Sequence, residues 1–340
     1  MTEIIRLCQG QPWAGPRLPA DQVPALVAIA GRAPSILNTQ PWLFRVAGNA
    51  VELHADPGRA LRLLDPAGRE LMISCGAALY GLRLAVRRLG YVPAVSLRPD
   101  PARPALLARV YLGAPAPMTG REWGLLAAVP HRYTHRGPFS PGPLPDGLLA
   151  GLQHDAIAEG AALALVGEPP AFQRLARLAA AAGTWRRRAA QAEIRRWTRP
   201  PGSTARDGVA AGAYPASAPE PDLGETGRLA QRDFDLGRGW GRAGEAGAPA
   251  AATAILTTAA DTPQDWLRAG QALQRMLLHA ATTWVFASMT SEPLELSPIR
   301  ALVRSGLGLA GTPQMLLQFG RVHTAAASAR RPASDLLQTG

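Results

Sequence analysis

The sequence contains no lysine, so all 36 of its basic side chains are arginines. Together with abundant alanine, glycine and proline, this is typical of a GC-rich genome and is not by itself a functional signal. The two cysteines, Cys8 and Cys75, are too few for a disulfide framework or a cysteine metal centre. The longest apolar run, within 276–289, is interrupted by His279 and is too short to span a bilayer.

The first residues also lack the basic region and apolar run of a secretory signal peptide. We therefore expect a cytoplasmic protein. The length of 340 residues allows one large domain or two of ordinary size, and an apolar content of 47% is sufficient for a real core.

A net charge of +11 would suit a nucleic-acid or membrane partner. The arginines are spread along the whole chain, however, and no zinc-finger spacing, aromatic RNA-binding motif or basic heptad region accompanies them. A solvated helix face is the favoured interpretation of the densest group, and a basic nucleic-acid-binding module stays as an alternative. That group consists of Arg186, Arg187, Arg188, Arg195, Arg196 and Arg199.

Hydrophobic periodicity predicts two successive sets of helices and strands, separated by the linker 113–120. The first set is a helix from Asp21 to Gly31, a hairpin of strands 42–47 and 50–55 around Gly48-Asn49, a helix capped by Asp65 with Arg83, Arg87 and Arg88 facing away from the core, and strands 92–97 and 106–112. The second set is helices near 121–129, 145–154 and 169–199, strands 161–166 and 251–258, a helix 263–289, a short helix at 297 and a strand 313–322.

Because the second set repeats the first in outline, we expect an α+β pseudo-dimer with halves 1–117 and 118–340. Residues 200–249, called the lid segment below, are rich in glycine, proline, serine and alanine. We expect few bulky residues to anchor this segment, and we expect it to be mobile and to cover a site.

The stretch "HRYTHRGPF" at 131–139 places Arg132, Thr134 and Arg136 at alternate positions. In an extended chain these three side chains share one face. Two guanidiniums that flank a hydroxyl suit a phosphate group. The alternative is an ordinary basic loop.

The stretch "APSILNTQPW" at 33–42 has no regular period, yet it leads directly into an apolar strand. Ser35, Asn38 and Gln40 offer hydrogen-bond donors and acceptors that match the mixed edge of a flat heterocycle such as a flavin ring. The alternative is a structural turn, and Trp42 belongs to the core on either interpretation.

Other motifs are weak. His131 and His135 have a metal-ligand spacing, but arginines and no carboxylate surround them. The stretch "GRGWGRAG" at 237–244 lacks the strand and helix that a dinucleotide fingerprint needs, and we expect a loop there. We find no convincing Ser/His/Asp set, so the sequence indicates neither a catalytic side chain nor a metal site.

Taken together, these segments resemble the FMN-dependent nitroreductase superfamily, and within it the Acg-like branch, whose chains hold two nitroreductase-type halves. The resemblance rests on "APSILNTQPWLFRV", "DPAGRELMISCGAALYGLRLAVRRLGY", "HRYTHRGPF" and "GTPQMLLQFGR", and covers nearly the whole chain. It implies a nitroreductase-like α+β fold with one FMN per chain, held between the halves.

The resemblance also implies roles for individual residues. Arg132, Thr134, Arg136 and Arg321 would bind the phosphate; Pro34, Ser35, Asn38 and Gln40 would border the ring; Ser291 and Glu292 would lie near its reactive nitrogen, N5. The implied activity is two-electron transfer from a donor such as NAD(P)H to a small organic substrate. A flavin-sequestering protein whose lid segment blocks hydride donors is the alternative. We expect a monomeric pseudo-dimer without a membrane or nucleic-acid partner, with further pairing left open.

Overall fold

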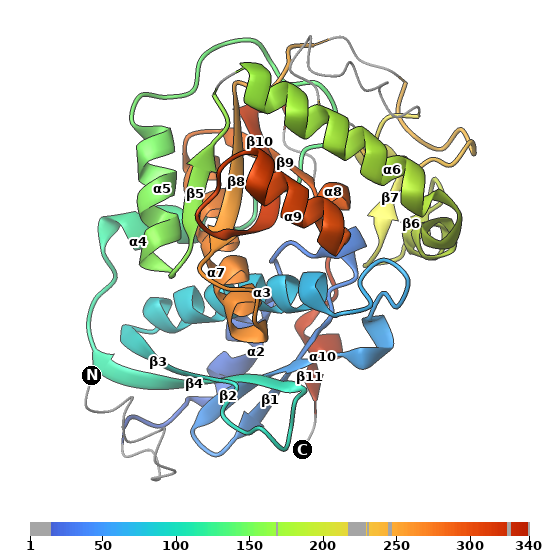
Figure 1. Ribbon diagram of the computed structural model, residues 1–340. Coiled ribbons are helices and arrows are strands. Elements are labelled where there is room, and N and C mark those ends of the chain that lie inside the picture. The colour runs from blue at the N-terminus through green and yellow to red at the C-terminus, as the bar shows by residue number, and fades with distance from the viewer. Residues whose placement is uncertain are drawn as a thin grey trace.

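The computed structural model of this chain contains two sheets with helices between and around them (Figure 1). It describes residues 15–167, 169–216, 229, 231–243, 247–324 and 328–338, but not the side chains of 183–189. Cys8, the side chains of Arg186, Arg187 and Arg188, and the middle of the lid segment therefore lie outside the described residues.

The first sheet has five strands in the order β11-β1-β2-β4-β3. Strands β1 (Trp42–Ala47) and β2 (Ala50–Ala55) form the expected hairpin, in which Ala47 pairs with Ala50 around Gly48-Asn49. Strands β3 (Tyr91–Leu97) and β4 (Leu106–Pro115) complete its antiparallel part. The alternating side chains Trp42 and Phe44 are fully buried, which is why the hairpin packs on one face only.

The helices of the first half begin later than expected. A 3-10 turn precedes α2 (Val23–Ala30), so Asp21 does not cap it. Helix α3 (Arg69–Arg88) follows Gly68 instead of Asp65. The Asp65 carboxylate still accepts a hydrogen bond from the Leu71 backbone N–H at 2.8 Å, so it serves the first turn of α3 from outside the helix.

The second sheet has four antiparallel strands in the order β5-β8-β10-β9. These are β5 (Ala162–Leu165), β8 (Ala252–Thr258), β9 (Val285–Thr290) and β10 (Thr312–Arg321). Helix α7 (Pro263–Thr282) has the expected capping box of Thr262 and Asp265, but it ends before 289. Trp284 takes a left-handed conformation with φ of 60°, and the apolar residues after it form β9. A short apolar run fits either a helix or a strand, so periodicity alone misassigned it.

The remaining elements surround the second sheet or return to the first. They are α4 (Gly120–Ala128), α5 (Leu148–Ala158), α6 (Pro169–Trp197), α8 (Glu292–Glu295), α9 (Ser297–Gly306), the short strands β6 (Thr198–Arg199) and β7 (Val209–Ala210), α10 (Ala333–Leu336) and β11 (Leu337–Gln338). Strand β11 pairs in parallel with β1. Residues 328–338, the C-terminal arm, thus join the sheet of the first half, although we expected them in the second (Figure 1).

Helices α3 and α7 cross in backbone contact at Gly76 and Gly270. A Cβ atom at Gly76 would lie 2.2 Å from the Leu267 carbonyl oxygen, and one at Gly270 would lie 2.0 Å from the Ile73 carbonyl oxygen. Each helix has 20 residues and each glycine is the eighth of them, which is the placement expected of two related halves.

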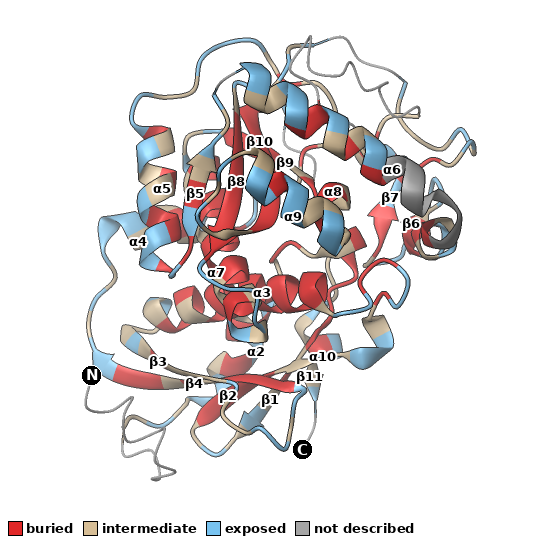
Figure 2. Cartoon of the chain, in the orientation of Figure 1, coloured by how far each residue is buried: buried red, intermediate tan, exposed pale blue. Residues whose placement is uncertain are grey.

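This crossing buries α3 on nearly every side (Figure 2). The expectation that Arg83 faces away from the rest of the protein is therefore wrong. Its guanidinium donates to the Glu159 carboxylate and, at 2.9 Å, to the Gln271 side chain, both in the second half. The ion pair with Glu159 compensates the Arg83 charge, which the crossing of α3 and α7 partly removes from water.

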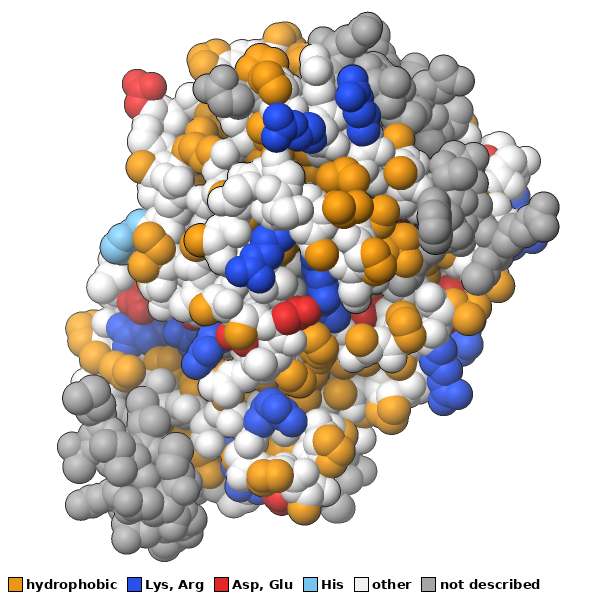
Figure 3. All heavy atoms as spheres, in the orientation of Figure 1, with side chains coloured by type: hydrophobic (Ala, Val, Ile, Leu, Met, Phe, Trp, Pro, Cys, Tyr) orange, Lys and Arg blue, Asp and Glu red, His pale blue; other side chains and the backbone are white. Residues whose placement is uncertain are grey.

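On the face shown in Figure 3, arginine side chains lie in separate groups with uncharged and acidic side chains between them. None of the described helices combines the length and the apolar character that crossing a membrane requires.

Candidate functional site

A cavity lies between the two halves, and both motifs singled out from the sequence contribute to it. It encloses about 770 Å³ of empty space, part of which is open to solvent. The two motifs are about a hundred residues apart, so only the fold brings them together. The cavity is lined by Pro34, Ser35, Ile36, Leu37, Glu70, Ile73, Ser74, Thr134, Arg136, Gln231, Arg232, Phe234, Leu273, Ser288, Met289, Thr290, Ser291, Glu292 and Met315. Six of the ten predicted site residues are among them: Pro34, Ser35, Thr134, Arg136, Ser291 and Glu292.

The irregular turn at 35–40 forms one edge of the cavity. Leu37, Asn38 and Gln40 have φ of 47°, 52° and 50°, a left-handed conformation that side-chain-bearing residues rarely adopt. The Ser35 hydroxyl accepts from the Gln40 backbone N–H at 2.9 Å, and the Ser74 hydroxyl of α3 accepts from the Ile36 N–H at 3.2 Å. The surrounding structure thus over-determines a strained turn, as is common at functional sites.

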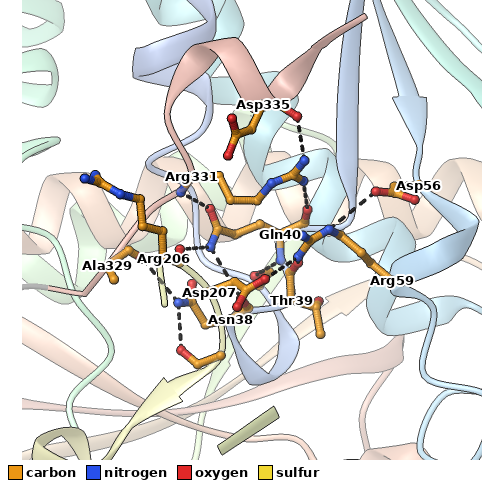
Figure 4. Close-up of polar contacts among 12 residues, drawn as sticks. Asn38, Thr39, Gln40, Asp56, Arg59, Arg206, Asp207, Ala329, Arg331 and Asp335 are labelled. Atoms are coloured by element: carbon orange, nitrogen blue, oxygen red, sulfur yellow. Dashed lines mark hydrogen bonds and ion pairs between the residues drawn. The ribbon is translucent and has the colours of Figure 1, made fainter. Parts of the chain in front are cut away.

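The side chains of Asn38 and Gln40 are not among the residues that line the cavity, so their place beside the ring stays a prediction. Both lie beside Arg206, Ala329 and Arg331 (Figure 4). The Asn38 amide donates to the carbonyl oxygens of Gly208 at 2.9 Å and Ala329 at 3.2 Å. The Gln40 amide donates to the Arg206 carbonyl oxygen at 2.8 Å and accepts from the Arg331 N–H at 2.9 Å. Both amides therefore fasten the turn to the lid segment and the C-terminal arm.

The "HRYTHRGPF" stretch is extended, as its alternation requires. Thr134 bridges to Ala287 of β9, and the His135 N–H donates to the Ala287 carbonyl oxygen at 2.9 Å. Thr134 and Arg136 line the cavity, whereas Arg132 is 4% exposed and lies behind it. The Nη2 of Arg132 donates to the Arg32 carbonyl oxygen at 3.2 Å, but its buried Nε and Nη1 have no hydrogen-bond partner among the described residues.

Sequence reasoning missed Arg330 of the C-terminal arm. Its Nη2 lies 3.4 Å from the Arg32 carbonyl oxygen, the same atom that Arg132 contacts, and its Nη1 donates to Asn38 Oδ1 at 3.0 Å. Its buried Nε also has no partner in the described part of the chain. The only sequence signal was a pair of arginines before Pro332 among many other arginines.

Arg32, Arg132, Arg136 and Arg330, the arginine cluster, form no ion pair with any acidic residue that the structure describes. Burial and the charges of Arg32 and Arg136 lower the pKa of Arg132 to about 9. Burial and Arg232 lower the pKa of Arg136 to about 10, and burial and the three neighbours lower that of Arg330. Like charges gathered without a counter-charge are unfavourable, so the arginine cluster, of which Arg136 lines the cavity, is suited to an anion.

Arg321 is not among the residues that line the cavity, and its place among the phosphate ligands stays a prediction. Its Nε donates to the Pro143 carbonyl oxygen at 2.9 Å, and its own carbonyl oxygen accepts from the Ser140 N–H at 2.8 Å. The closing strand β10 therefore positions Arg321 against residues 140–143. Arg330, which follows β10 in the sequence, belongs to the arginine cluster.

Ser291 and Glu292 lie where β9 meets α8, opposite Arg232 of the lid segment. Arg232 pairs with Glu295, and lies 3.7 Å from the Glu292 carboxylate and 3.4 Å from the Ser291 hydroxyl. Burial would lower the pKa of Arg232, but the carboxylates of Glu295 and Glu292 outweigh it and raise the pKa. These contacts fix the lid segment to α8 at the cavity.

Glu70 is a second residue that sequence reasoning missed. It lines the cavity from the first turn of α3, is 4% exposed, and pairs with Arg69. Burial raises its pKa to about 7; the Arg69 charge opposes this shift, and Glu295 and Asp65 add to it. The cavity thus holds a buried carboxyl group whose pKa is raised above the usual range of glutamate.

The weaker motifs have structural roles. His135 contacts the Pro138 carbonyl oxygen at 2.8 Å and the Tyr133 hydroxyl at 3.2 Å, and the described residues contain no group of three side chains that could hold a metal. The described part of the glycine-rich stretch at 237–244 is a loop whose backbone N–H groups at 239–241 donate to the Asp235 carboxylate.

The fold and the site define an α+β protein with one cavity lined by residues of both halves, among them Thr134, Arg136 and the buried Glu70. No family model matches this chain. Over 307 residues, it is 35% identical to a protein of Mycobacterium tuberculosis H37Rv named "Putative NAD(P)H nitroreductase Rv3131", covering 88% of this chain and 85% of that one. It is 28% identical over 309 residues to the nitroreductase Acg of the same organism, covering 88% and 89% of the two chains. The chain belongs to the nitroreductase family, on the branch that includes Acg.

Two solved structures are also similar to parts of this chain. A nitroreductase with bound FMN from Desulfitobacterium hafniense is 12% identical, with a TM-score of 0.41, over 66% of this chain and 100% of that one. A nitroreductase-like protein from Bacillus cereus is 15% identical, with a TM-score of 0.38, over 67% and 99%.

Proposed function

We propose that this protein is an FMN-dependent oxidoreductase that carries two electrons from NAD(P)H to a small organic acceptor. The observation that carries the proposal is the arginine cluster, whose member Arg136 lines a cavity between the halves together with Thr134. Relatives named as NAD(P)H nitroreductases, and a solved nitroreductase with bound FMN, support the cofactor and the donor.

The residues present fit FMN, which combines a phosphate group with a flat ring. The unpartnered nitrogen atoms of Arg132 and Arg330 can donate to phosphate oxygens, together with Arg136 and the Thr134 hydroxyl. A phosphate dianion would also relieve the repulsion within the arginine cluster and raise the pKa of each guanidinium.

The rest of the cavity suits the ring and an acceptor stacked on it. The turn at 34–37 contributes the small Ser35 side chain and apolar side chains, while Ile73, Leu273 and Met315 offer further apolar surface. The bound flavin would supply the two-electron chemistry, and the protein binds it, orients it and excludes water. This division of roles explains why the sequence contains no convincing catalytic triad.

The experiment that tests the proposal is the absorbance spectrum of the purified protein after incubation with FMN. We expect a flavin spectrum with one FMN per chain, released on denaturation, and oxidation of NADPH when a quinone or a nitroarene is added. A protein that retains no flavin after this incubation would contradict the proposal.

Flavin sequestration is the second candidate, because the lid segment reaches the cavity. Gln231, Arg232 and Phe234 line it, and Phe234 lies under the Arg136 guanidinium at 5.2 Å. Against the expectation of few anchors, Tyr214 of the same segment is buried in a cluster with Leu37 and Leu64. We propose that residues 231–234 cover the cofactor and limit the access of hydride donors.

Phe234→Ala is expected to increase the rate at which dithionite reduces the bound flavin by roughly tenfold, because it removes an aromatic wall of the cavity. Stopped-flow absorbance measures this rate. Trp123→Ala is the matched control, since Trp123 is an aromatic side chain 52% exposed on α4. Equal rates in Phe234→Ala and the unaltered protein would show that residue 234 does not limit access. Steady-state turnover by the unaltered protein would then contradict the sequestration function.

A further inference from the structure

We propose that Glu70 is the proton donor of this site, and that its carboxyl group protonates an acceptor oxygen, such as a quinone carbonyl, that is reduced in the cavity. This inference rests on the proposed oxidoreductase function and assigns a chemical role to one residue within it.

The position of Glu70 supports this role. It is the second residue of α3 and lines the cavity together with Ser74, one helical turn later. The Ser74 hydroxyl donates to the Glu70 carbonyl oxygen at 2.7 Å and accepts from the Ile36 N–H at 3.2 Å. One side chain therefore joins the backbone of Glu70 to the strained turn that we place against the ring.

Arg69 positions the carboxyl group. Its Nη1 donates to the Gln314 carbonyl oxygen at 2.6 Å and to the Gln314 side-chain oxygen at 3.2 Å, while its Nη2 contacts Glu70. Both residues are 4% exposed, so the pair is held in a dry environment. A proton donor fixed in this way loses little orientational freedom when an acceptor binds.

The charges around Glu70 differ from those around the arginine cluster. The charges with the largest effects on the Glu70 pKa are those of Arg69, Glu295, Asp65 and Arg232. Glu295 belongs to α8, Asp65 to the loop before α3, and Arg232 to the lid segment. The Glu70 charge also acts on Arg300 of α9, where it partly opposes the lowering of the Arg300 pKa. Burial has the largest effect and raises the Glu70 pKa against the opposing charge of Arg69, which favours the acid form; that form is lost as the pH rises through the raised pKa.

The proton step balances as follows for a quinone. Its reduction to a hydroquinone takes up two electrons and two protons. The electron pair and the first proton would be supplied together, as a hydride, by a flavin that a nicotinamide donor has reduced, and Glu70 supplies the second proton. The O–H bond of the carboxyl group breaks as an O–H bond forms on the quinone oxygen, and the carboxylate then takes a proton from water at the open side of the cavity.

The kinetic test compares Glu70→Gln and Glu70→Asp with the unaltered, FMN-loaded protein, using menadione and NADPH. We expect kcat/KM for menadione to fall above about pH 7 in the unaltered protein. Glu70→Gln should lower it by roughly 100-fold and abolish this pH dependence, while Glu70→Asp should restore part of both. Asp146→Asn, on an exposed loop, is the charge-matched control. An unchanged rate and pH profile in Glu70→Gln would overturn the proposal.

An infrared pH titration gives a second readout that needs no turnover and applies even if Glu70→Gln folds poorly. We expect the C=O band of a protonated carboxyl group to titrate near pH 7 in the unaltered protein, and Glu70→Asp to shift it. A Glu70 that stays ionised from about pH 5 to 9 would overturn the proposal while leaving the FMN assignment intact. Absence of bound flavin would instead refute the proposed function, and this inference with it.

Discussion

Arg132→Ala is expected to weaken FMN binding by about 1.5–3 kcal/mol, the usual contribution of hydrogen bonds to charged groups. Arg132 is 4% exposed, and its Nε and Nη1 have no partner among the described residues, so these donors are available to a phosphate. Arg136→Ala is expected to have an effect of the same size, because Arg136 belongs to the same arginine cluster and lines the cavity directly.

Titration with FMN and with riboflavin measures this effect and separates the phosphate from the ring. Loss of a phosphate contact should weaken FMN binding and leave riboflavin binding unchanged. Arg304→Ala is the control, since Arg304 donates only to the nearby Ala310 carbonyl oxygen at an exposed position. Full FMN occupancy of both variants on dilution, or equal weakening of both ligands, would show that the phosphate assignment is wrong.

The same variants should behave differently in the absence of flavin. Because the arginine cluster has no acidic partner among the described residues, removal of Arg132 relieves repulsion between buried like charges. The free energy of unfolding of the flavin-free protein should therefore change little, although FMN affinity falls. A large loss of stability without flavin would indicate that Arg132 is a structural residue.

Gly270→Ala is expected to destabilise the protein by roughly 3 kcal/mol or more, the scale of severe overpacking. The new Cβ would lie 2.0 Å from the Ile73 carbonyl oxygen and 2.8 Å from the Ala77 nitrogen, both of which are helix backbone and cannot move independently. Helices α3 and α7 would have to separate. Since both also line the cavity, through Ile73 and Leu273, FMN affinity should fall as well.

Gly124→Ala is the matched control for this prediction. Gly124 lies within α4, and a Cβ there would meet only the Thr282 methyl group at 3.9 Å. Alanine is favoured over glycine inside a helix by about 1 kcal/mol, so this variant should be neutral or slightly stabilised. Urea unfolding followed by circular dichroism compares the two. Similar stability of Gly270→Ala and Gly124→Ala would disprove close backbone contact between the halves.

The elements that the sequence predicted well have local signals. The Gly48-Asn49 turn between two alternating strands led to the observed hairpin, because Gly48, with φ of 58°, takes the positive φ that the first position of a two-residue turn needs. Thr262, Pro263 and Asp265 marked the start of α7 because a capping box satisfies its own backbone groups. The end of α7 had no comparable signal, and Trp284 in a left-handed conformation decided it.

The site was predicted where one motif determines its own geometry. The alternation of Arg132, Thr134 and Arg136 requires only an extended chain, and the pairing with β9 supplies one. The directions of Asn38 and Gln40 depend on backbone groups at 206–208 and 329–331, which are remote in the sequence. An amide binds whichever partner the fold brings close, so its sequence position could not show that partner.

By itself, the sequence determined the repeated order of helices and strands, the irregular character of the turn at 33–42 and the two motifs that meet at the cavity, because each follows from patterns within a few residues. Only the tertiary structure decided that Arg330 and not Arg321 joins the arginine cluster, and that Glu70 is a buried acid at the cavity. The physical reason is that burial and the charges of distant segments set both the direction of a long side chain and the pKa of a carboxyl group, and these arise only when the halves pack together.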